Sequence, residues 1–576
     1  MKTRAILLFA LLSIGIAARA DVVSQEKARV VAENFLHVAG TRAAGGLTMA
    51  WDGSDAGTRA GESPLFYLFT NPAGGWVIVS GDESTAPVLG YSYHGTFGPV
   101  DRMPLNLKDH FDGLKDYIRK QRSSGLKAVP AEWAAAMAKT RADDTIPAGK
   151  LLVTAKYDQY APYGSLLPLL DNGKVAYTGC CTTAMVIIMK YHNWPTKGTG
   201  TGGDYTSSAH AYAPSITLDD HEYDWNHMLN VYTKGKYTEV QANAVATLMR
   251  DVAFAGKVNF DYNGSGGLMP NFVHAAWKHF HYAPAKRAEH YLYTDEEWFR
   301  IIKEDIDNGL PINYADNHSR VIDGYDTKGN VHFNYGWSGS SDGYYNITGQ
   351  GAEMCVHIRP DDGTPNDSFV ILLNEEGIIN KDNVSFTKDV PFDLSLKNIG
   401  SLGFESKEIQ FVFAHMDRDG NLKELVSKPK TLNATYTTYV PFARISCVCK
   451  EEIYVGDNVQ VLYREGKNDS YPWKKVLYQI ASSSTSCHAL PLTPEPLDFT
   501  VAMAYDKTAD CFTFTTAPDV GFAILDSNGN EMPSDCFSIN EGTIKVFGDK
   551  LAGGEYTVKF SATTYVDSKE LRIRVN

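Results

Sequence analysis

The chain contains little cysteine for its length. Only eight cysteines occur among 576 residues, too few for a fold held together by disulfides. Basic residues are also fewer than acidic ones: the chain has 54 Lys and Arg against 68 Asp and Glu, which gives a formal net charge of −14. That balance argues against nucleic acid or an anionic membrane as a partner.

Long hydrophobic runs are missing after the first twenty residues, so no later segment is expected to span a bilayer. The N-terminus has the pattern of a secretory signal: basic Lys2 and Arg4, an apolar run over 5–17 and a small-residue cleavage site at 18–20. The alternative, a retained membrane anchor, is disfavoured because the run is short. We therefore expect a signal peptide at 1–20 and an exported protein.

The rest of the composition is that of folded material, with 43% hydrophobic, 12% aromatic and 21% charged residues. A chain of this length is too long for one core. Its pattern changes from mixed helix and strand, through helices followed by strands, to short alternating strands. We predict an α+β fold with a small domain at 21–145, a central domain at 146–362 and β-sandwich modules at 363–489 and 490–576.

Hydrophobic periodicity locates individual elements in the first two domains. Helical spacing predicts helices over 25–39, 105–121, 180–193, 238–255 and 295–308. Alternation predicts strands over 64–69, 75–82, 310–315, 319–325, 330–335 and 343–347. The stretch 123–150 indicates an exposed, cleavable connection, and the proline-rich segment 490–496 indicates a linker.

The most informative segment is the pair of cysteines that opens the helix predicted over 180–193. Gly179 is a turn residue that delivers Cys180 to the first turn of an apolar helix. A helix N-terminus carries unpaired N–H groups and a partial positive charge, both of which favour the thiolate. Because the thiolate is a nucleophile, a histidine brought beside it would complete a cysteine hydrolase site.

Two histidines compete for the role of the base. His192 follows Cys180 by twelve residues, about 18 Å along a helix axis and therefore beyond hydrogen-bond reach. His318 opens the strand predicted over 319–325. A cysteine on a helix followed by a histidine on a later strand is the order of a papain-like arrangement. We therefore pair Cys180 with His318.

Four motifs follow one another between residues 60 and 350. They are Gly75-Trp76-Val77-Ile78-Val79-Ser80-Gly81-Asp82, Gly179-Cys180-x-x-Thr183-Ala184-Met185, His318-x-x-Val321-Ile322-Asp323-Gly324 and Asn334-x-Gly336-Trp337-x-Gly339. Together they resemble the streptopain family of bacterial papain-like cysteine proteases. The first motif is similar to that family's inhibitory propeptide.

This resemblance implies a secreted, periplasmic or surface-bound bacterial cysteine endopeptidase that is made as a zymogen. The segment 21–145 would be the inhibitory propeptide and 146–362 the papain-like catalytic domain, with Cys180 as the nucleophile and His318 as the general base. The partners implied are protein or peptide substrates and the chain's own propeptide. No cofactor and no metal are implied.

The resemblance also implies roles around the catalytic pair. The amide of Gln159 and the backbone N–H of Cys180 would form the oxyanion hole. The group that orients or shields the histidine is open among Asn334, Tyr335 and Trp337: papain-like enzymes use an asparagine, whereas the streptopain pattern has aromatic residues near this position.

Four further residues lie in or near these motifs. Cys181 is expected to pack in the core, because its side chain leaves the helix about 100° from that of Cys180. Arg320 is expected to line the substrate groove and tune specificity. Gly266 and Gly267 indicate a flexible rim of that groove, since no P-loop lysine follows to suggest a phosphate site.

A zinc site built from Cys447, Cys449, Cys487 and His488 is disfavoured, because one Cys-x-Cys without a second paired motif is a poor zinc pattern. We expect buried strand residues there instead. Two rival functions remain at this stage. One is a surface or adhesion protein that uses its β-modules around an impaired protease core, and the other is a different cysteine acyl-transfer enzyme.

Overall fold

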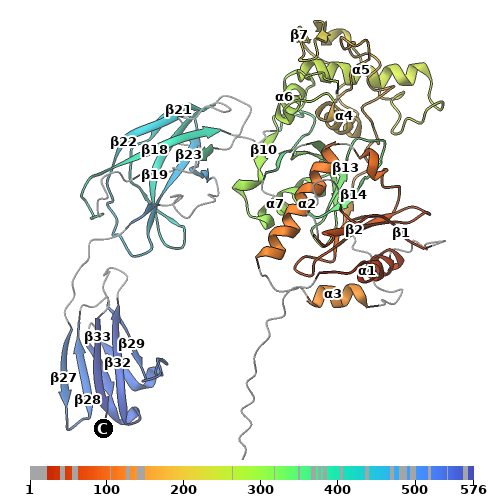
Figure 1. Cartoon of the computed structure of the whole chain (residues 1–576). Coiled ribbons are helices and arrows are strands. Elements are labelled where there is room, and N and C mark those ends of the chain that lie inside the picture. Colours follow the sequence, from red (N-terminus) through yellow and green to blue (C-terminus); the bar gives the residue numbers. More distant parts are fainter. Residues whose placement is uncertain are drawn as a thin grey trace, which may run out of the picture. The chain divides into compact units, whose positions relative to one another are not determined.

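The structure is a computed structural model of the chain (Figure 1). It describes residues 22–575 apart from 39–45, 55–61, 104, 125–129, 139–148, 263, 317, 348–350, 365–370, 374–377, 380–385, 402–406, 435–439, 467–471, 479–489, 493–500, 517–519, 541–542 and 562–568. The predicted signal peptide lies outside the described residues. The chain divides into two compact units, Met1–Ser368 and Phe369–Asn576. Of the helices that can be described, none is long and apolar enough to cross a membrane.

The first unit begins with helices packed on an antiparallel ribbon. The helices are α1 (Gln25–Val38), α2 (Leu105–Ser123) and α3 (Pro130–Met137), and the strands are β1 (Thr48–Trp51), β2 (Phe66–Thr70), β3 (Trp76–Ser80) and β4 (Val88–Ser92). The predicted pair of strands corresponds to β2 and β3, joined by a turn in which the Asn71 N–H donates to the Gly75 carbonyl. Apolar residues of α1, among them Val31 and Leu36, pack with Phe69 and Val77 of the ribbon.

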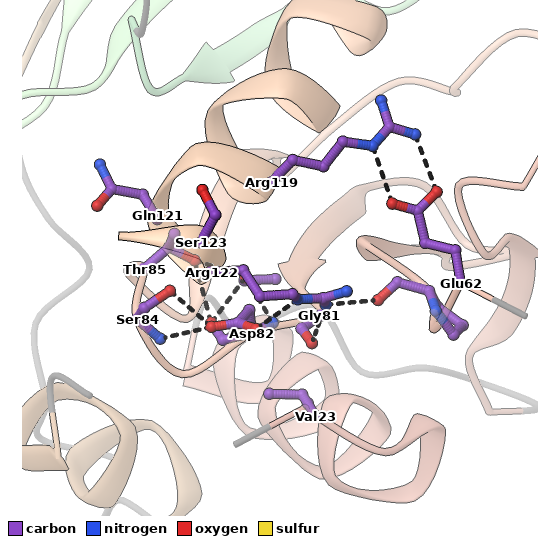
Figure 2. A network of polar contacts seen from close by, with 12 residues as sticks. Val23, Glu62, Gly81, Asp82, Ser84, Thr85, Arg119, Gln121, Arg122 and Ser123 are labelled. Atoms are coloured by element: carbon purple, nitrogen blue, oxygen red, sulfur yellow. Dashed lines mark hydrogen bonds and ion pairs between the residues drawn. The ribbon is translucent and has the colours of Figure 1, made fainter. Parts of the chain in front are cut away.

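Arginines near the end of α2 hold this helix to the ribbon (Figure 2). The Arg122 Nε donates to the buried Asp82 carboxylate at 2.7 Å, and Asp82 also accepts the Ser84 N–H at 3.0 Å. Arg119 makes two parallel hydrogen bonds to Glu62, at 2.9 and 3.0 Å. A bidentate pair of this kind fixes geometry as well as charge. The network therefore ties α2 to the segment before β2, through Glu62, and to the turn after β3, through Asp82.

The predicted exposed connection over 123–150 is wrong in its middle. Residues Pro130–Met137 form α3, whose Trp133 is only 2% exposed. The Trp133 indole donates to the Thr85 carbonyl at 3.0 Å, and the Asn34 amide of α1 donates to the Ala136 carbonyl. The polar composition suggested an exposed connection, but burial of Trp133 anchors this stretch to the N-terminal domain. The N-terminal fold therefore extends through α3.

The central part of the first unit contributes further strands to the same sheet. These are β5 (Lys150–Leu151), β10 (Lys286–Glu289), β11 (Ile312–Ala315), β12 (Ser319–Tyr325), β13 (Val331–Asn334), β14 (Gly343–Tyr345) and β15 (Glu353–Val356). The order of the sheet is β1-β2-β3-β4-β14-β13-β12-β11-β15-β10, with β5 on β12. One sheet therefore runs from the N-terminal ribbon into the central domain, with β4 and β14 at the junction (Figure 1).

Aromatic side chains reinforce the junction of β4 with β14. Tyr91 of β4 stacks on Tyr344 with ring centroids 5.1 Å apart, and its hydroxyl donates to Asp326 at 2.7 Å. The Trp76 ring lies 5.2 Å from that of Tyr345. A Cβ on Gly343 would approach Trp76 to 2.5 Å, so glycine is needed for this close contact.

Helices α4 (Cys180–His192), α5 (Glu239–Ala255), α6 (Met269–His279) and α7 (Asp295–Asp307) complete the central domain. Three of them were predicted, and α5 and α7 begin with capping boxes at Thr238 and Thr294. Helix α6 was missed, although a proline in the first turn is compatible with a helix. Short ribbons fill the region before α5: β6 (Thr201–Gly202), β7 (Tyr205–Thr206), β8 (Tyr212–Ala213) and β9 (Ile216–Thr217).

The second unit consists of strands, as predicted, with short 3-10 turns at Ser534–Cys536 and Gly548–Lys550. Its first core uses β16 (Ile371–Leu373), β17 (Ile378–Ile379), β18 (Phe392–Ser401), β19 (Lys407–Met416), β20 (Leu422–Leu425), β21 (Lys430–Ala434), β22 (Val440–Cys447), β23 (Asn458–Glu465), β24 (Lys474–Lys475), β25 (Leu477–Tyr478) and β26 (Leu490–Pro491). Its second core uses β27 (Ala502–Asp506), β28 (Cys511–Thr515), β29 (Gly521–Leu525), β30 (Phe537–Asn540), β31 (Thr543–Phe547), β32 (Gly554–Ser561) and β33 (Lys569–Val575).

The division predicted at residue 490 falls slightly too early. Strand β26 pairs with β23, and Leu492 belongs to the first β-core. Val501 is the first described residue that packs against the second β-core. The boundary between the two cores therefore lies between 492 and 501.

Candidate active site

Helix α4 presents Cys180 at its first turn, as the sequence predicts. Gly179 precedes it with φ 80°, in the left-handed region that favours glycine. A Cβ at Gly179 would lie 2.6 Å from the Ser265 carbonyl oxygen. Both constraints explain the glycine, which lets the chain turn tightly against the loop 264–267 and aims the thiol out of the helix start.

The two adjacent thiols lie closer together than expected from their helical positions. The Cys180 Sγ is 3.9 Å from the Cys181 Sγ. Cys181 is buried, and its S–H donates to the Gly267 carbonyl at 3.2 Å, whereas Cys180 is partly exposed. Cys181 is thus the packed residue of the pair, and it also touches the reactive one.

The surroundings of Cys180 favour its thiolate form. Hydrogen bonding with Cys181 and the nearby imidazole of His318 hold the pKa of the Cys180 thiol well below its ordinary value, against the opposing effect of burial. The pKa of Cys181 moves up, because of the same contact with Cys180 and because of burial. The contact therefore makes Cys180 the more acidic thiol of the pair.

His318 lies directly before β12, within hydrogen-bonding reach of the Cys180 thiol. Its backbone N–H donates to the Asp316 carboxylate at 3.3 Å. Its ring nitrogen Nε2 lies 3.4 Å from the carbonyl oxygen of Tyr335. The structure thus brings together the cysteine and the histidine that the sequence paired.

Aromatic rings cover the imidazole. Trp337 stacks on His318 with ring centroids 5.1 Å apart and an interplanar angle of 21°. Tyr335 stacks on Trp337 at 4.8 Å and lies 6.4 Å from His318. Both aromatic candidates named from the sequence therefore contact the histidine.

Asn334, the third candidate for orienting His318, is engaged elsewhere. Its amide donates to the Thr154 hydroxyl at 3.0 Å and to the Ala155 carbonyl at 2.9 Å. Its oxygen accepts the Gly336 N–H at 3.1 Å. The hypothesis that this side chain orients His318 is wrong, because Asn334 ties β13 to the segment before the active-site helix. The carbonyl of Tyr335 stands beside the imidazole instead.

The placement of Arg320 in the substrate groove is also wrong. Its side chain is only 1% exposed and pairs with the Asp316 carboxylate. Its guanidinium packs over the rings of Phe333, Tyr314 and Tyr335, at 4.2, 5.0 and 5.1 Å from their centroids. Arg320 thus lies inside the aromatic core, and it holds Asp316, whose other oxygen accepts the His318 N–H.

Gln159 lies on the segment that borders the nucleophile. Its carbonyl accepts the Thr178 N–H at 3.3 Å, two residues before Cys180. The preceding Asp158 accepts the Ser338 hydroxyl at 2.6 Å. The loop of Gln159 is therefore held both to the approach of α4 and to the loop that carries Trp337.

The remaining predicted positions have clear locations. Gly267 accepts the Cys181 S–H, and a Cβ on Gly266 would meet no atom within 4 Å, so Gly266 has open space beside the thiols. His192 lies at the far end of α4, where its Nε2 is 3.2 Å from the Ile358 carbonyl. It does not share the site with Cys180.

Sequence reasoning missed Asp316 and Asp342 as parts of this site. Asp316 links His318 to Arg320, and Asp342 accepts the Tyr335 N–H at 3.0 Å. Burial raises the pKa of Asp342 to about 7. The residues Ser341-Asp342-Gly343, which directly follow the motif around Trp337, could have pointed to Asp342, but nothing in the sequence links Asp316 to Arg320.

Comparison with known proteins places these features in a family. Residues 157–345 match the Peptidase C10 family, and residues 20–118 match the Spi protease inhibitor. The first match contains the cysteine, the histidine and the covering aromatics. The second contains the ribbon β1–β4 and most of α2.

Two curated relatives agree with the family match. The chain is 32% identical over 308 residues to the thiol protease/hemagglutinin PrtT of Porphyromonas gingivalis, covering 50% of this chain and 35% of that protein. It is 30% identical over 312 residues to streptopain of Streptococcus pyogenes, covering 49% of this chain and 73% of streptopain. A solved fragment of prointerpain A from Prevotella intermedia is 26% identical with a TM-score of 0.44, covering 52% of this chain and 97% of the fragment. The chain spans about a third of PrtT, and it belongs to the peptidase C10, or streptopain, family of cysteine proteases.

Proposed function

We propose that this chain is a secreted cysteine endopeptidase, made as a zymogen, in which Cys180 and His318 form a thiolate–imidazolium pair. The observation that carries the proposal is the position of Cys180, a partly exposed thiol at a helix start within hydrogen-bonding reach of His318. A thiolate is the attacking form of cysteine. The apolar segment at 5–17 supports export.

In the first chemical step the Cys180 Sγ attacks the carbonyl carbon of the scissile peptide bond. With its Nε2 turned to the Tyr335 carbonyl, His318 has Nδ1 left to face the thiol. The imidazolium then gives its proton to the leaving amine, and a thioester to Cys180 remains. Water, deprotonated by the neutral imidazole, hydrolyses that thioester and regenerates the thiolate.

The oxyanion of each tetrahedral intermediate needs hydrogen-bond donors that are already in place. We propose the Cys180 backbone N–H and the side-chain amide of Gln159. The support for Gln159 is its position on a loop fastened on two sides, through Thr178 and through Ser338. Trp337, stacked on His318, would exclude water from the pair.

We further propose that the N-terminal segment inhibits the enzyme while it remains attached. Its strand β4 extends the catalytic sheet at β14. Its loop reaches the neighbourhood of Trp337, because the Ser341 N–H donates to the Thr96 carbonyl at 3.2 Å. Maturation would cut the chain after α3, since Trp133 is buried in the N-terminal core.

The experiment compares the purified full chain with Cys180→Ala and Cys181→Ala. We expect the parent chain to shorten during incubation, to cleave casein and to bind an epoxide cysteine-protease inhibitor at Cys180. Cys180→Ala should stay at full length, inactive and unlabelled. Cys181→Ala is the matched control, since its thiol is adjacent but buried.

Each rival predicts another result. An adhesion protein with an impaired core would show neither processing nor labelling in the parent chain. A different acyl-transfer enzyme would be labelled at Cys180 but leave casein intact. Normal processing by Cys180→Ala would overturn the catalytic assignment, and loss of activity in Cys181→Ala alone would move the nucleophile to Cys181.

A further inference from the structure

A second cluster of potential ligand atoms lies in the first β-core of the second unit. His415 is on β19, Glu424 is on β20 and Cys449 follows β22. One imidazole nitrogen, one carboxylate oxygen and the thiol sulfur of these residues all lie within 4.8 Å of one another. They come from three separate parts of the chain, so the fold itself brings them together.

The pairing of β19 with β20 places two of the three residues directly opposite each other. His415 and Glu424 are cross-strand partners of β19 and β20. The His415 Nδ1 lies 3.2 Å from the Glu424 Oε1. Glu424 is also held by the backbone N–H groups of Lys450 and Glu451 at 2.9 Å, directly after Cys449. The carboxylate therefore cannot swing away from the imidazole or from the cysteine.

The other nitrogen of His415 has a carboxylate partner of its own. The His415 Nε2 lies 2.8 Å from the Asp457 Oδ2, and the same oxygen accepts the Lys423 ammonium at 2.9 Å and the Tyr454 N–H at 3.0 Å. In protein metal sites a ligating histidine usually donates its second N–H to a carboxylate, which fixes the ring and its tautomer. Asp457 is placed to do this for His415.

The Cys449 thiol supplies an independent observation. Its side chain is 0% exposed, and across the described residues its sulfur takes part in no hydrogen bond. Cys447, two residues earlier and also buried, donates its S–H to the Ile445 carbonyl at 3.4 Å. Within the part of the chain that the structure describes, Cys449 is thus the one of these two thiols whose sulfur has no hydrogen-bond partner, and it lies within 4.8 Å of an imidazole nitrogen and a carboxylate oxygen.

We propose that His415, Glu424 and Cys449 form a zinc site, with His415 binding through Nδ1 and Asp457 as the carboxylate partner of its Nε2–H. Nitrogen, oxygen and thiolate ligands together suit Zn²⁺, and three protein ligands leave the fourth tetrahedral position for water. The Glu424 side chain is 13% exposed, which leaves a side from which water and the ion can enter.

Zinc binding at this site would release protons to solvent. Zn²⁺ binds cysteine as the thiolate and histidine through an unprotonated nitrogen, so the Cys449 thiol proton and any proton on the His415 Nδ1 leave as the metal enters. Closing donor atoms from within 4.8 Å to tetrahedral spacing requires side-chain shifts of about 1 Å.

The ligand set differs from the one that the sequence raised and disfavoured. Cys487 and His488 lie outside the described residues, and Cys447 does not reach the cluster. Only Cys449 is common to both sets. A Cys-x-Cys pattern carries no information on the second set, because His415 and Glu424 meet across a hairpin.

The test uses the full chain with Cys180→Ala, which removes the reactive thiol and prevents processing. After incubation with zinc sulfate and exhaustive dialysis, metal analysis should find about one zinc ion per chain. Cobalt(II) in its place should give a thiolate-to-cobalt charge-transfer band and the visible bands of tetrahedral coordination. Asp457→Asn should weaken zinc binding about 10- to 100-fold.

Cys449→Ser and Cys447→Ser form the matched pair in that background. We expect Cys449→Ser to lose the retained zinc and the charge-transfer band, while Cys447→Ser keeps both. Equal zinc retention by the two variants, or no charge-transfer band in the Cys180→Ala chain itself, would overturn the site. The second result needs no substitution in the cluster, so it decides the matter even if Cys449→Ser does not fold.

Discussion

His318 and Arg320 lie two residues apart but have different surroundings, which we call the thiol side and the arginine side. On one side, His318 meets Cys180 under the rings of Trp337 and Tyr335. On the other side, Arg320 lies under Tyr335, which contacts Tyr345, and Tyr345 in turn contacts His110 of α2. Ring contacts through Tyr335 and Tyr345 therefore connect the Cys180–His318 pair to the docked N-terminal segment.

Asp316 joins the two sides. One of its carboxylate oxygens accepts the His318 N–H and the other accepts the Arg320 guanidinium. A change in packing on the Arg320 side can therefore reach His318 through a carboxylate shared by both. This comparison predicts that the thiol side controls the chemical rate, whereas the arginine side controls stability and latency.

The largest effect is expected on the thiol side, from His318→Ala. Peptidase activity should fall by roughly 10³-fold or more, because the pair loses its general acid and base. The pKa of Cys180 should rise, since the imidazole helps to lower it. Iodoacetamide alkylation of the mature enzyme, followed against pH, should move to higher pH. An unchanged alkylation profile would contradict the pairing, and His192→Ala is the matched control.

The next effect concerns the oxyanion. Gln159→Ala should lower kcat by roughly 10²- to 10³-fold with little change in KM, because the lost hydrogen bond acts in the transition state. Steady-state kinetics on a peptide substrate would measure it. A rise in KM at constant kcat would mean that Gln159 binds substrate and does not stabilise the oxyanion.

On the arginine side, Asp316→Ala should destabilise the chain by about 3 kcal/mol, because it leaves the buried Arg320 guanidinium without its carboxylate. Denaturant unfolding of the Cys180→Ala zymogen would measure this. Adding Arg320→Met should restore most of the loss, since the charge is then gone. Purely additive losses in the double variant would show that the pair does not act as one unit.

Latency should depend on pH through His110. Burial and the nearby Arg320 lower the pKa of His110 to about 4 from 6.5, with Asp316 opposing them. The docked state therefore binds fewer protons at His110 than the undocked one, so the contribution of His110 to docking is fully present above about pH 6.5 and is lost as the pH falls toward 4. Processing should accelerate over that range. His110→Phe should flatten the dependence, and a parallel acceleration in His110→Phe would assign it elsewhere.

The smallest effect is expected from Cys181→Ala. Loss of its contact with Cys180 should raise the pKa of the nucleophile modestly and reduce activity a few-fold at low pH. A pH–rate profile of the mature enzyme would detect the change. Full activity across the whole profile would mean that Cys181 serves packing alone.

Much of the site could be predicted from the sequence because its signals are local. Gly179 before Cys180 indicates a turn into a helix. The twelve-residue spacing from Cys180 to His192 excludes His192 as the base, because the two lie too far apart along one helix. Arg320 was misplaced because the face on which a side chain lies depends on the pleat and on the partner strands. Asn334 was misassigned because its hydrogen-bond partners, Thr154 and Ala155, are distant in the sequence.

The fold was predictable to a similar degree. Helices with strong periodicity, such as α5 and α7, matched within one residue at either end. The buried Trp133 and the short strand β26 were missed, because isolated contacts decide both and no periodic pattern accompanies them. The continuity of the sheet from β4 to β14 had no sequence signal at all.

That continuity has a consequence for the mature enzyme. When the N-terminal segment leaves, β14 changes from an interior strand to an edge strand, and the backbone groups that paired with Gly90 and Tyr91 lose their partners. The released segment then becomes an ordinary soluble ligand for that edge. Inhibition is intramolecular, and so independent of concentration, while the segment is attached. After cleavage it depends on the concentration of the released segment, so a concentrated enzyme solution would remain inhibited longer than a dilute one.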